Sequence, residues 1–263
     1  MSRFDDRNVT GRPLDTPRGA SGDNRPPRPP RTPVFNLPPV VMTLALVLAA
    51  VHAVIVFGLG APAVNSLYEW FGFIPQRLLH ADRFDGGLLP LLWTPLTHGF
   101  LHANWEHLGF NLAWLAVFGS PVARRYGARG FALIGAAGAV AGAAGFMLFN
   151  LDGISVMIGA SGAISGLTGA AMRFVFQPVE VSIDPETGER RVLGRRLASW
   201  REFVGNRRAM SISLVLLALN AGVGLLAYLM GEPAAVAWQS HVAGFAVGLL
   251  AVGSVERLAL QPR

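Results

Sequence analysis

The sequence predicts an all-α membrane protein with six transmembrane helices. Hydrophobic residues make up 52% of the 263 residues and charged residues only 14%, whereas a soluble domain usually carries about 25% charged residues. Six apolar stretches are long enough to cross, or nearly cross, a bilayer, for which about 20 residues are needed. They lie at 38–60, 100–120, 129–149, 154–176, 209–230 and 235–256.

The two ends of the chain differ from the apolar part. Residues 1–36 are rich in Arg, Asp, Gly and Pro and have few apolar residues to bury, so they are expected to form a disordered tail. No short apolar run follows the start closely enough to indicate a signal peptide. We therefore expect one membrane domain at 37–258 and a short C-terminus at 259–263.

The basic residues, which are all Arg, predict the orientation of the spans. They gather in the tail, at 124–129, at 173–208 and after the last span, whereas only Arg77 and Arg83 lie in the other set of loops. Under the positive-inside rule, both termini are cytoplasmic. We expect an integral protein of a bacterial inner membrane. The net charge of +6 is interpreted as a topology signal, and no nucleic-acid partner is expected.

Two loops are long enough to carry structure of their own. The first loop, 61–99, is half apolar but interrupted by Pro and Gly, so it is expected outside and partly embedded in the membrane interface. The cytoplasmic loop, 177–208, alternates apolar and polar residues on both sides of a Pro-Glu-Thr-Gly turn, which predicts a β-hairpin.

Polar residues inside the apolar spans are the candidates for function, because such groups are costly in lipid. His102 and His107 lie near the start of the second span, Ser161 near that of the fourth and His241 near that of the sixth. All three spans begin at the outer face. In a helix running from residue 154, Ser161 would lie about 10 Å below the helix start.

Ser161 and His241 form a candidate nucleophile and base. A serine hydroxyl needs a base to become nucleophilic, and histidine is the usual one. Gly244 and Gly248 share one face of the sixth span, where they permit close approach to another helix. If that helix is the fourth span, His241 comes within reach of Ser161. Without that contact, a serine among small residues more often serves helix packing.

His107 and Asn111 are four residues apart and share one helix face. Two donors aimed in one direction are what an oxyanion hole requires, and backbone N–H groups at Ser161 and Gly162 could add to them. The alternative is that His107 and Asn111 bond a neighbouring helix and hold the bundle together. Acidic residues such as Glu106, Asp152 and Glu232 lie at the edges of the spans and not deep inside them, so a Ser–His dyad is favoured over a triad.

Metal and thiol chemistry have little support in the sequence. The chain has no Cys, which excludes disulfides, thiolate catalysis and Cys-ligated metals. His102, Glu106 and His107 resemble a zincin motif superficially, but their spacing fits neither known order. His98 and His102 are spaced to bind a metal if helical. Metal catalysis is the weaker interpretation, and no metal is expected.

Taken together, these motifs resemble those of the rhomboid family of intramembrane serine proteases. The resemblance covers about 38–258 and rests on three motifs in the expected order on spans two, four and six. They are His98-x-x-x-His102-x-x-x-x-His107-x-x-x-Asn111, Gly159-x-Ser161-Gly162 and His241-x-x-Gly244-x-x-x-Gly248.

The resemblance implies a six-helix rhomboid bundle with a membrane-embedded first loop, and a role for each motif residue. Ser161 would be the nucleophile, His241 the general base, and His107, Asn111 and the backbone at Ser161 and Gly162 the oxyanion hole. His102, Gly159, Gly244 and Gly248 would be structural residues near the site. Span five with its following loop would gate substrate entry, and no metal or organic cofactor is implied.

Two positions depart from the family pattern. Where the family often has Trp-Arg in the first loop, this chain has Trp93-Thr94. Four residues after the nucleophile, where the family often has a Tyr or Phe that stacks under the catalytic histidine, it has Ser165.

The leading hypothesis is an endopeptidase that cleaves transmembrane segments of membrane-protein substrates within or near the bilayer. One alternative is a catalytically inactive rhomboid-like protein that binds membrane clients. A second is a small transporter, for which an unpaired intramembrane charge or broken-helix repeats would be expected, and the sequence shows neither.

Overall fold

The computed structural model describes residues 36–152, 155–230 and 237–259. Most of the predicted tail and the last four residues lie outside this range. The chain separates into two units, 1–36 and 37–263, and the helices and strands of the described residues belong to the second.

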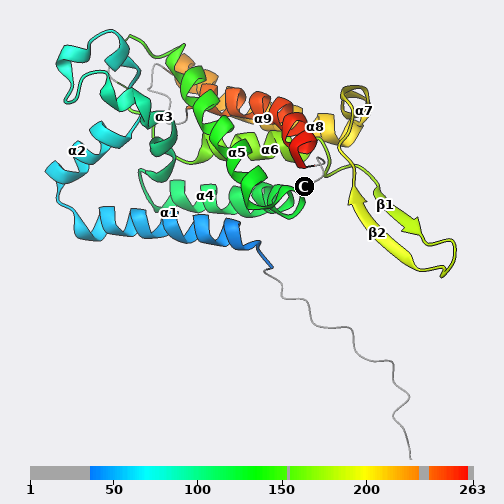
Figure 1. Cartoon of the computed structure of the whole chain (residues 1–263). Helices are drawn as coiled ribbons and strands as arrows, with labels where there is room; N and C mark the ends of the chain where they lie inside the picture. Colours follow the sequence, from blue (N-terminus) through cyan, green and yellow to red (C-terminus); the bar gives the residue numbers. More distant parts are fainter. Residues whose placement is uncertain (1–35, 153–154, 231–236, 260–263) are drawn as a thin grey trace, which may run out of the picture. The chain divides into compact units, whose positions relative to one another are not determined.

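This unit is mostly helical (71%), with one hairpin in the loop 177–208 (Figure 1). The helices are α1 (Pro39–Gly58), α2 (Ala61–Phe71), α3 (Thr94–Thr97), α4 (Trp105–Trp114), α5 (Ser120–Met147), α6 (Ser161–Met172), α7 (Trp200–Gly205), α8 (Arg207–Leu229) and α9 (Trp238–Ala259), and the strands are β1 (Val179–Ile183) and β2 (Arg190–Arg195).

Within the described residues, three helical runs are long and apolar enough to cross a membrane: Pro39–Gly58, Trp105–Met147 and Trp238–Leu258. The second of these contains two of the predicted spans, because α4 continues through one π-helical turn, Leu115–Gly119, into α5. Gly127 interrupts α5 with φ 65° and ψ −172°, so the run bends there. The number of six spans stays a prediction.

The prediction of a helix running from residue 154 to Ser161 was wrong, because the described residues 155–160 are not helical. Helix α6 begins at Ser161, and the residues just before it bond to the first loop instead. Phe73 and Met157 exchange backbone hydrogen bonds of 3.0 and 2.9 Å, and the Gly159 N–H donates to the His98 carbonyl at 2.9 Å. These bonds satisfy backbone groups that a longer helix would have paired internally, and they place Ser161 at a helix start.

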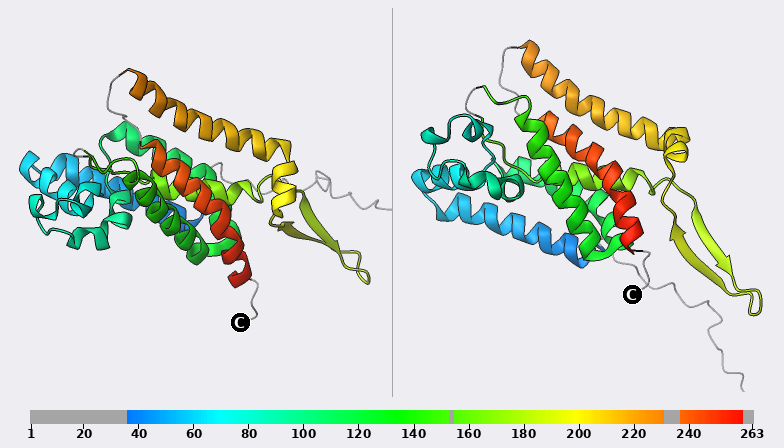
Figure 2. Two further views of the ribbon diagram at one scale, coloured as in Figure 1. Left: turned by 90° about the horizontal axis from the view of Figure 1, so that it is seen from above. Right: turned by 45° about the horizontal axis from the view of Figure 1, so that its top comes forward.

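Glycines bring α5, α6 and α9 into backbone contact at the centre of the bundle (Figures 1 and 2). A Cβ added at Gly138 of α5 would lie 2.9 Å from both the Gly162 carbonyl oxygen and the Gly166 Cα. On α9, a Cβ at Gly244 would overlap the Gly162 carbonyl oxygen, and one at Gly248 would overlap that of Gly166. Small residues thus let three helices pack closely without large side chains between them.

The first loop is organised around a buried guanidinium. The Arg77 side chain is fully buried and donates to the carbonyl oxygens of Asp85 at 2.7 Å, Gly87 at 3.0 Å and Glu69 at 2.9 Å. Trp93 Nε1 donates to the Trp70 carbonyl at 2.8 Å, and their rings stack. These bonds anchor the loop internally, so it can support residues 157–159 from the side.

Residues 179–195 form the predicted antiparallel hairpin, made of β1 and β2, with an irregular register between Glu180 and Val181. At its turn, Asp184 Oδ1 accepts from the backbone N–H groups of Thr187 at 3.0 Å and Glu186 at 2.9 Å. These two bonds hold the pKa of the Asp184 carboxyl below its ordinary value, because they favour its charged form.

Candidate active site

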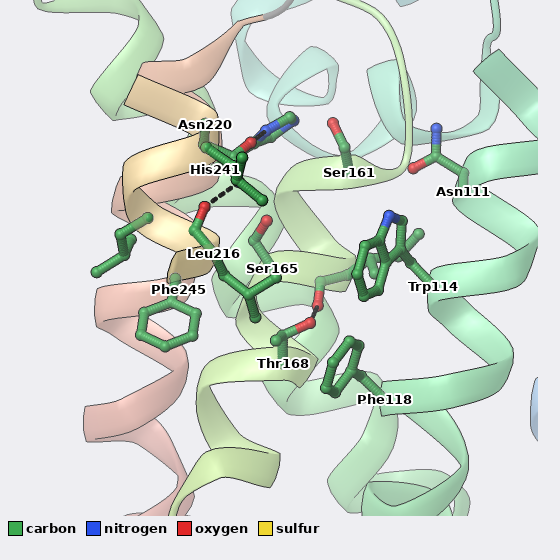
Figure 3. A pocket seen from close by; sticks show the side chains of 13 residues that line it. Asn111, Trp114, Phe118, Ser161, Ser165, Thr168, Leu216, Asn220, His241 and Phe245 are labelled. Atoms are coloured by element: carbon green, nitrogen blue, oxygen red, sulfur yellow. Dashed lines mark hydrogen bonds between the residues drawn. The ribbon is translucent and has the colours of Figure 1, made fainter. Parts of the chain in front are cut away.

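A cavity of about 170 Å³ lies where four helices meet (Figure 3). Its lining includes Asn111 from α4, Ser161 and Ser165 from α6, Asn220 from α8 and His241 from α9. Three of the residues singled out in the sequence, Asn111, Ser161 and His241, therefore face one space although 130 positions of chain separate the first from the last.

Ser161 is the first residue of α6 and is partly exposed to the cavity. The first N–H groups of an α-helix have no acceptor within the helix, and they carry the positive end of its dipole. The backbone N–H groups of Ser161 and Gly162 are in this position. A helix start beside the hydroxyl therefore offers donors to a negative oxygen formed next to it.

Gly159 lets the chain turn into that helix under the imidazole of His107. Its φ of 118° is a conformation that side-chain-bearing residues rarely adopt. A Cβ there would lie 2.7 Å from both Cε1 and Nε2 of His107, and 3.8 Å from Ser161 Oγ. His107 of α4 and Ser161 of α6 thus both lie near the position that a Gly159 side chain would occupy. Residue 159 must therefore be glycine for its backbone conformation and for lack of space.

His107 and Asn111 are held mainly by their own helix. Asn104 caps α4 by accepting from the His107 N–H at 2.8 Å, and Asn111 Nδ2 donates to the His107 carbonyl at 2.9 Å. The alternative, in which these residues bond a neighbouring helix, does not describe this Asn111 contact, which stays within α4. An amide nitrogen has two protons, so this bond uses only one of them.

His102 packs behind this group. It is fully buried, and its ring lies edge-on to that of His107 at 5.0 Å between centroids and to that of His52 at 6.4 Å. His98 is buried where its carbonyl meets Gly159. Among the described residues, no cluster of three or more His, Asp or Glu side chains is arranged to hold a metal ion.

The base candidate has a partner that the sequence patterns did not indicate. His241 Nδ1 is hydrogen-bonded to Oδ1 of Asn220 on α8 (Figure 3). The sequence does contain a signal for this residue, because Asn220 is a polar side chain inside the apolar stretch 209–230. Polar side chains inside spans are candidates for function whether they are histidines or amides. His52, buried in α1, was missed in the same way.

A comparison with known protein families covers the residues that line the cavity. A family model described as "Rhomboid domain" matches residues 90–255. That range covers more than half of the chain and includes every residue that lines the cavity. No curated protein matches the chain.

Proposed function

This chain belongs to the rhomboid family, and we propose that it is an intramembrane serine endopeptidase that cleaves transmembrane segments of membrane proteins. The observation that carries the proposal is a cavity lined both by Ser161, at the start of a helix, and by His241, whose Nδ1 is hydrogen-bonded to Asn220. A serine, a base and a group that orients the base are the parts that acyl transfer requires.

The proposed reaction uses these groups in two steps. Ser161 Oγ attacks the carbonyl carbon of the scissile peptide bond while its proton passes to Nε2 of His241. The oxygen that becomes negative accepts hydrogen bonds from the start of α6 and from His107 and Asn111. His241 then gives its proton to the leaving amine, and an acyl-enzyme forms. Water, deprotonated by the same nitrogen, hydrolyses the ester and restores Ser161.

A serine-directed fluorophosphonate tests this function. The purified full-length chain in lipid bilayers is expected to be labelled at Ser161 and to cleave a model transmembrane substrate. The alternative, an inactive rhomboid-like protein that binds membrane clients, would retain the substrate without cutting it. Binding of the substrate with neither label nor cleavage would favour that alternative.

Gly159→Ala is expected to lower kcat/KM by about 100-fold or more, since about 1 Å of displacement at a catalytic group costs that much. The added methyl would push against the His107 ring and strain the turn before Ser161. Gly188→Ala is the matched control, because Gly188 also has a positive φ, 69°, but no atom within 4 Å of an added Cβ. Equal rates for the two variants and the wild type would contradict this account of Gly159.

The orientation is part of the proposal: an integral protein of a bacterial inner membrane, with both termini cytoplasmic and the active site opening to the outer side. It rests on the distribution of Arg residues among the loops. A reporter enzyme that works only outside the cytoplasm is expected to be active when inserted in the first loop and inactive when inserted at the tip of the β1–β2 hairpin. The opposite pattern would reverse the orientation.

A further inference from the structure

We propose that Asn220 is a positioning residue that holds His241 in the tautomer and orientation needed for a general base. The proposal rests on the function proposed above and adds a third member to the Ser161–His241 pair. It comes from α8, which both views in Figure 2 show at the edge of the bundle beside α9.

The direction in which the Asn220 amide points is set by its own helix. Its Nδ2 donates to the Leu216 carbonyl at 2.8 Å, one turn earlier on α8. With the nitrogen held there, Oδ1 is the atom directed at His241 Nδ1 (Figure 3). Exchanging the two amide atoms would place an N–H group against the imidazole and an oxygen against the Leu216 oxygen, so the observed assignment is the consistent one.

That direction determines which imidazole nitrogen carries the proton. An amide oxygen only accepts hydrogen bonds, so Nδ1 of His241 must be the donor. In the neutral ring, Nε2 is then unprotonated. Nε2 is the nitrogen that must accept the proton of the serine hydroxyl, and Ser161 lines the same cavity. The contact therefore selects the reactive tautomer before substrate binds.

The side chain below the imidazole makes this contact more important. Ser165, one turn after Ser161, lines the cavity with a small hydroxymethyl group and offers no ring against which the imidazole could stack. A hydrogen bond from α8 constrains both the rotation of the ring about its Cβ bond and its tautomer. The hydrogen bond from Asn220 thus orients the His241 imidazole, which the small side chain of Ser165 cannot do by stacking.

Among the described residues that line the cavity with His241, none is Asp, Glu or Arg, so the effect of adding a charge can be predicted. His107 on α4 is a titratable group close enough to His241 to interact with it electrostatically, and the residues of α6 and α8 that line the cavity are uncharged. On α5, Arg125 is paired with Glu256 near the other end of α9. Compared with the acidic groups of the described residues, a carboxylate introduced at position 220 would therefore be the nearest to the imidazole.

The first test reads the tautomer without requiring activity. The full chain carrying Ser161→Ala is labelled with ¹⁵N-histidine, and the His241 signals are assigned by their loss in His241→Ala. We expect Nδ1 protonated and Nε2 bare at neutral pH. Replacing Asn220 by Leu, which has a similar size and no acceptor, is expected to shift His241 toward the Nε2–H form. An Nε2–H form in the presence of Asn220 would overturn the proposal.

The second test is kinetic. Asn220→Leu is expected to lower kcat about 10- to 100-fold with KM within about 2-fold, since general-base catalysis contributes about 10²–10⁴-fold and only its orientation is lost. Asn220→Asp restores the acceptor and is expected to recover most of kcat. Its carboxylate stabilises the charged imidazolium, so the acidic limb of the kcat/KM profile moves to higher pH. Ser213→Ala, two turns away on α8, is expected to behave as the wild type.

The outcomes separate this proposal from the function on which it rests. A wild-type chain that is neither labelled nor active would refute the protease, whatever the tautomer of His241. An active wild type whose Asn220→Leu variant keeps its kcat and pH profile would refute the positioning role alone. A loss of kcat in Asn220→Leu that Asn220→Asp does not recover, with an unchanged tautomer, would show that Asn220 is only structural.

Discussion

Alanine at Ser161 or at His241 is expected to abolish cleavage of a transmembrane substrate while the protein still folds. Members of a nucleophile–base pair act as a unit, so the loss of either removes nearly the whole effect, on the order of 10⁶ in kcat in a soluble serine protease. Both side chains face the cavity and are only partly buried, so their truncation leaves the packing of the helices in place. Cleavage and fluorophosphonate labelling measure the loss, and thermal unfolding verifies the fold.

Ser165→Ala is the matched control for this result. Ser165 lies on the same helix and lines the same cavity as Ser161, one turn further along, and its removal is expected to leave the reaction intact. Asn111→Ala is expected to give an intermediate rate, about 10²–10³-fold below wild type, because one oxyanion donor is lost while backbone donors remain. Full activity in Ser161→Ala or His241→Ala would refute the pair.

The second large effect is expected at a position that touches no reacting atom. Gly248→Ala would place a methyl group into the Gly166 carbonyl of α6, so α9 must move away from α6. Overpacking of this kind costs about 1–3 kcal/mol of stability, and a shift near 1 Å at His241 costs about 100-fold in rate. We expect a lower unfolding temperature together with a loss of cleavage. Gly244→Ala, against Gly162, is expected to act in the same direction.

Gly253→Ala isolates the effect of packing from that of helix propensity. Gly253 lies on the same helix α9, but an added Cβ would meet no atom within 4 Å. Alanine is a better helix former than glycine by up to about 1 kcal/mol, so this variant is expected to be as stable as the wild type or more so. If Gly248→Ala were as stable and active as Gly253→Ala, close contact between α6 and α9 would not position the base.

Sequence patterns were sufficient for the features that depend on composition along the chain. The apolar stretches predicted a helical membrane protein, and the spacing of His107, Asn111, Ser161 and His241 indicated the family that the domain match then showed. These signals are local: hydropathy and short motifs report what each segment is made of. From them one could predict that Ser161 and His241 lie at a similar depth in the membrane.

The tertiary structure decided how those segments meet. The start of α6 at Ser161 depends on backbone bonds to Phe73 and His98 from the first loop. The partner of His241 depends on which face of α8 turns toward α9. A membrane helix is apolar on nearly every side, so its sequence does not distinguish the face that meets another helix from the face that meets lipid. Only the packed structure selects that face, and with it the contact between Asn220 and His241.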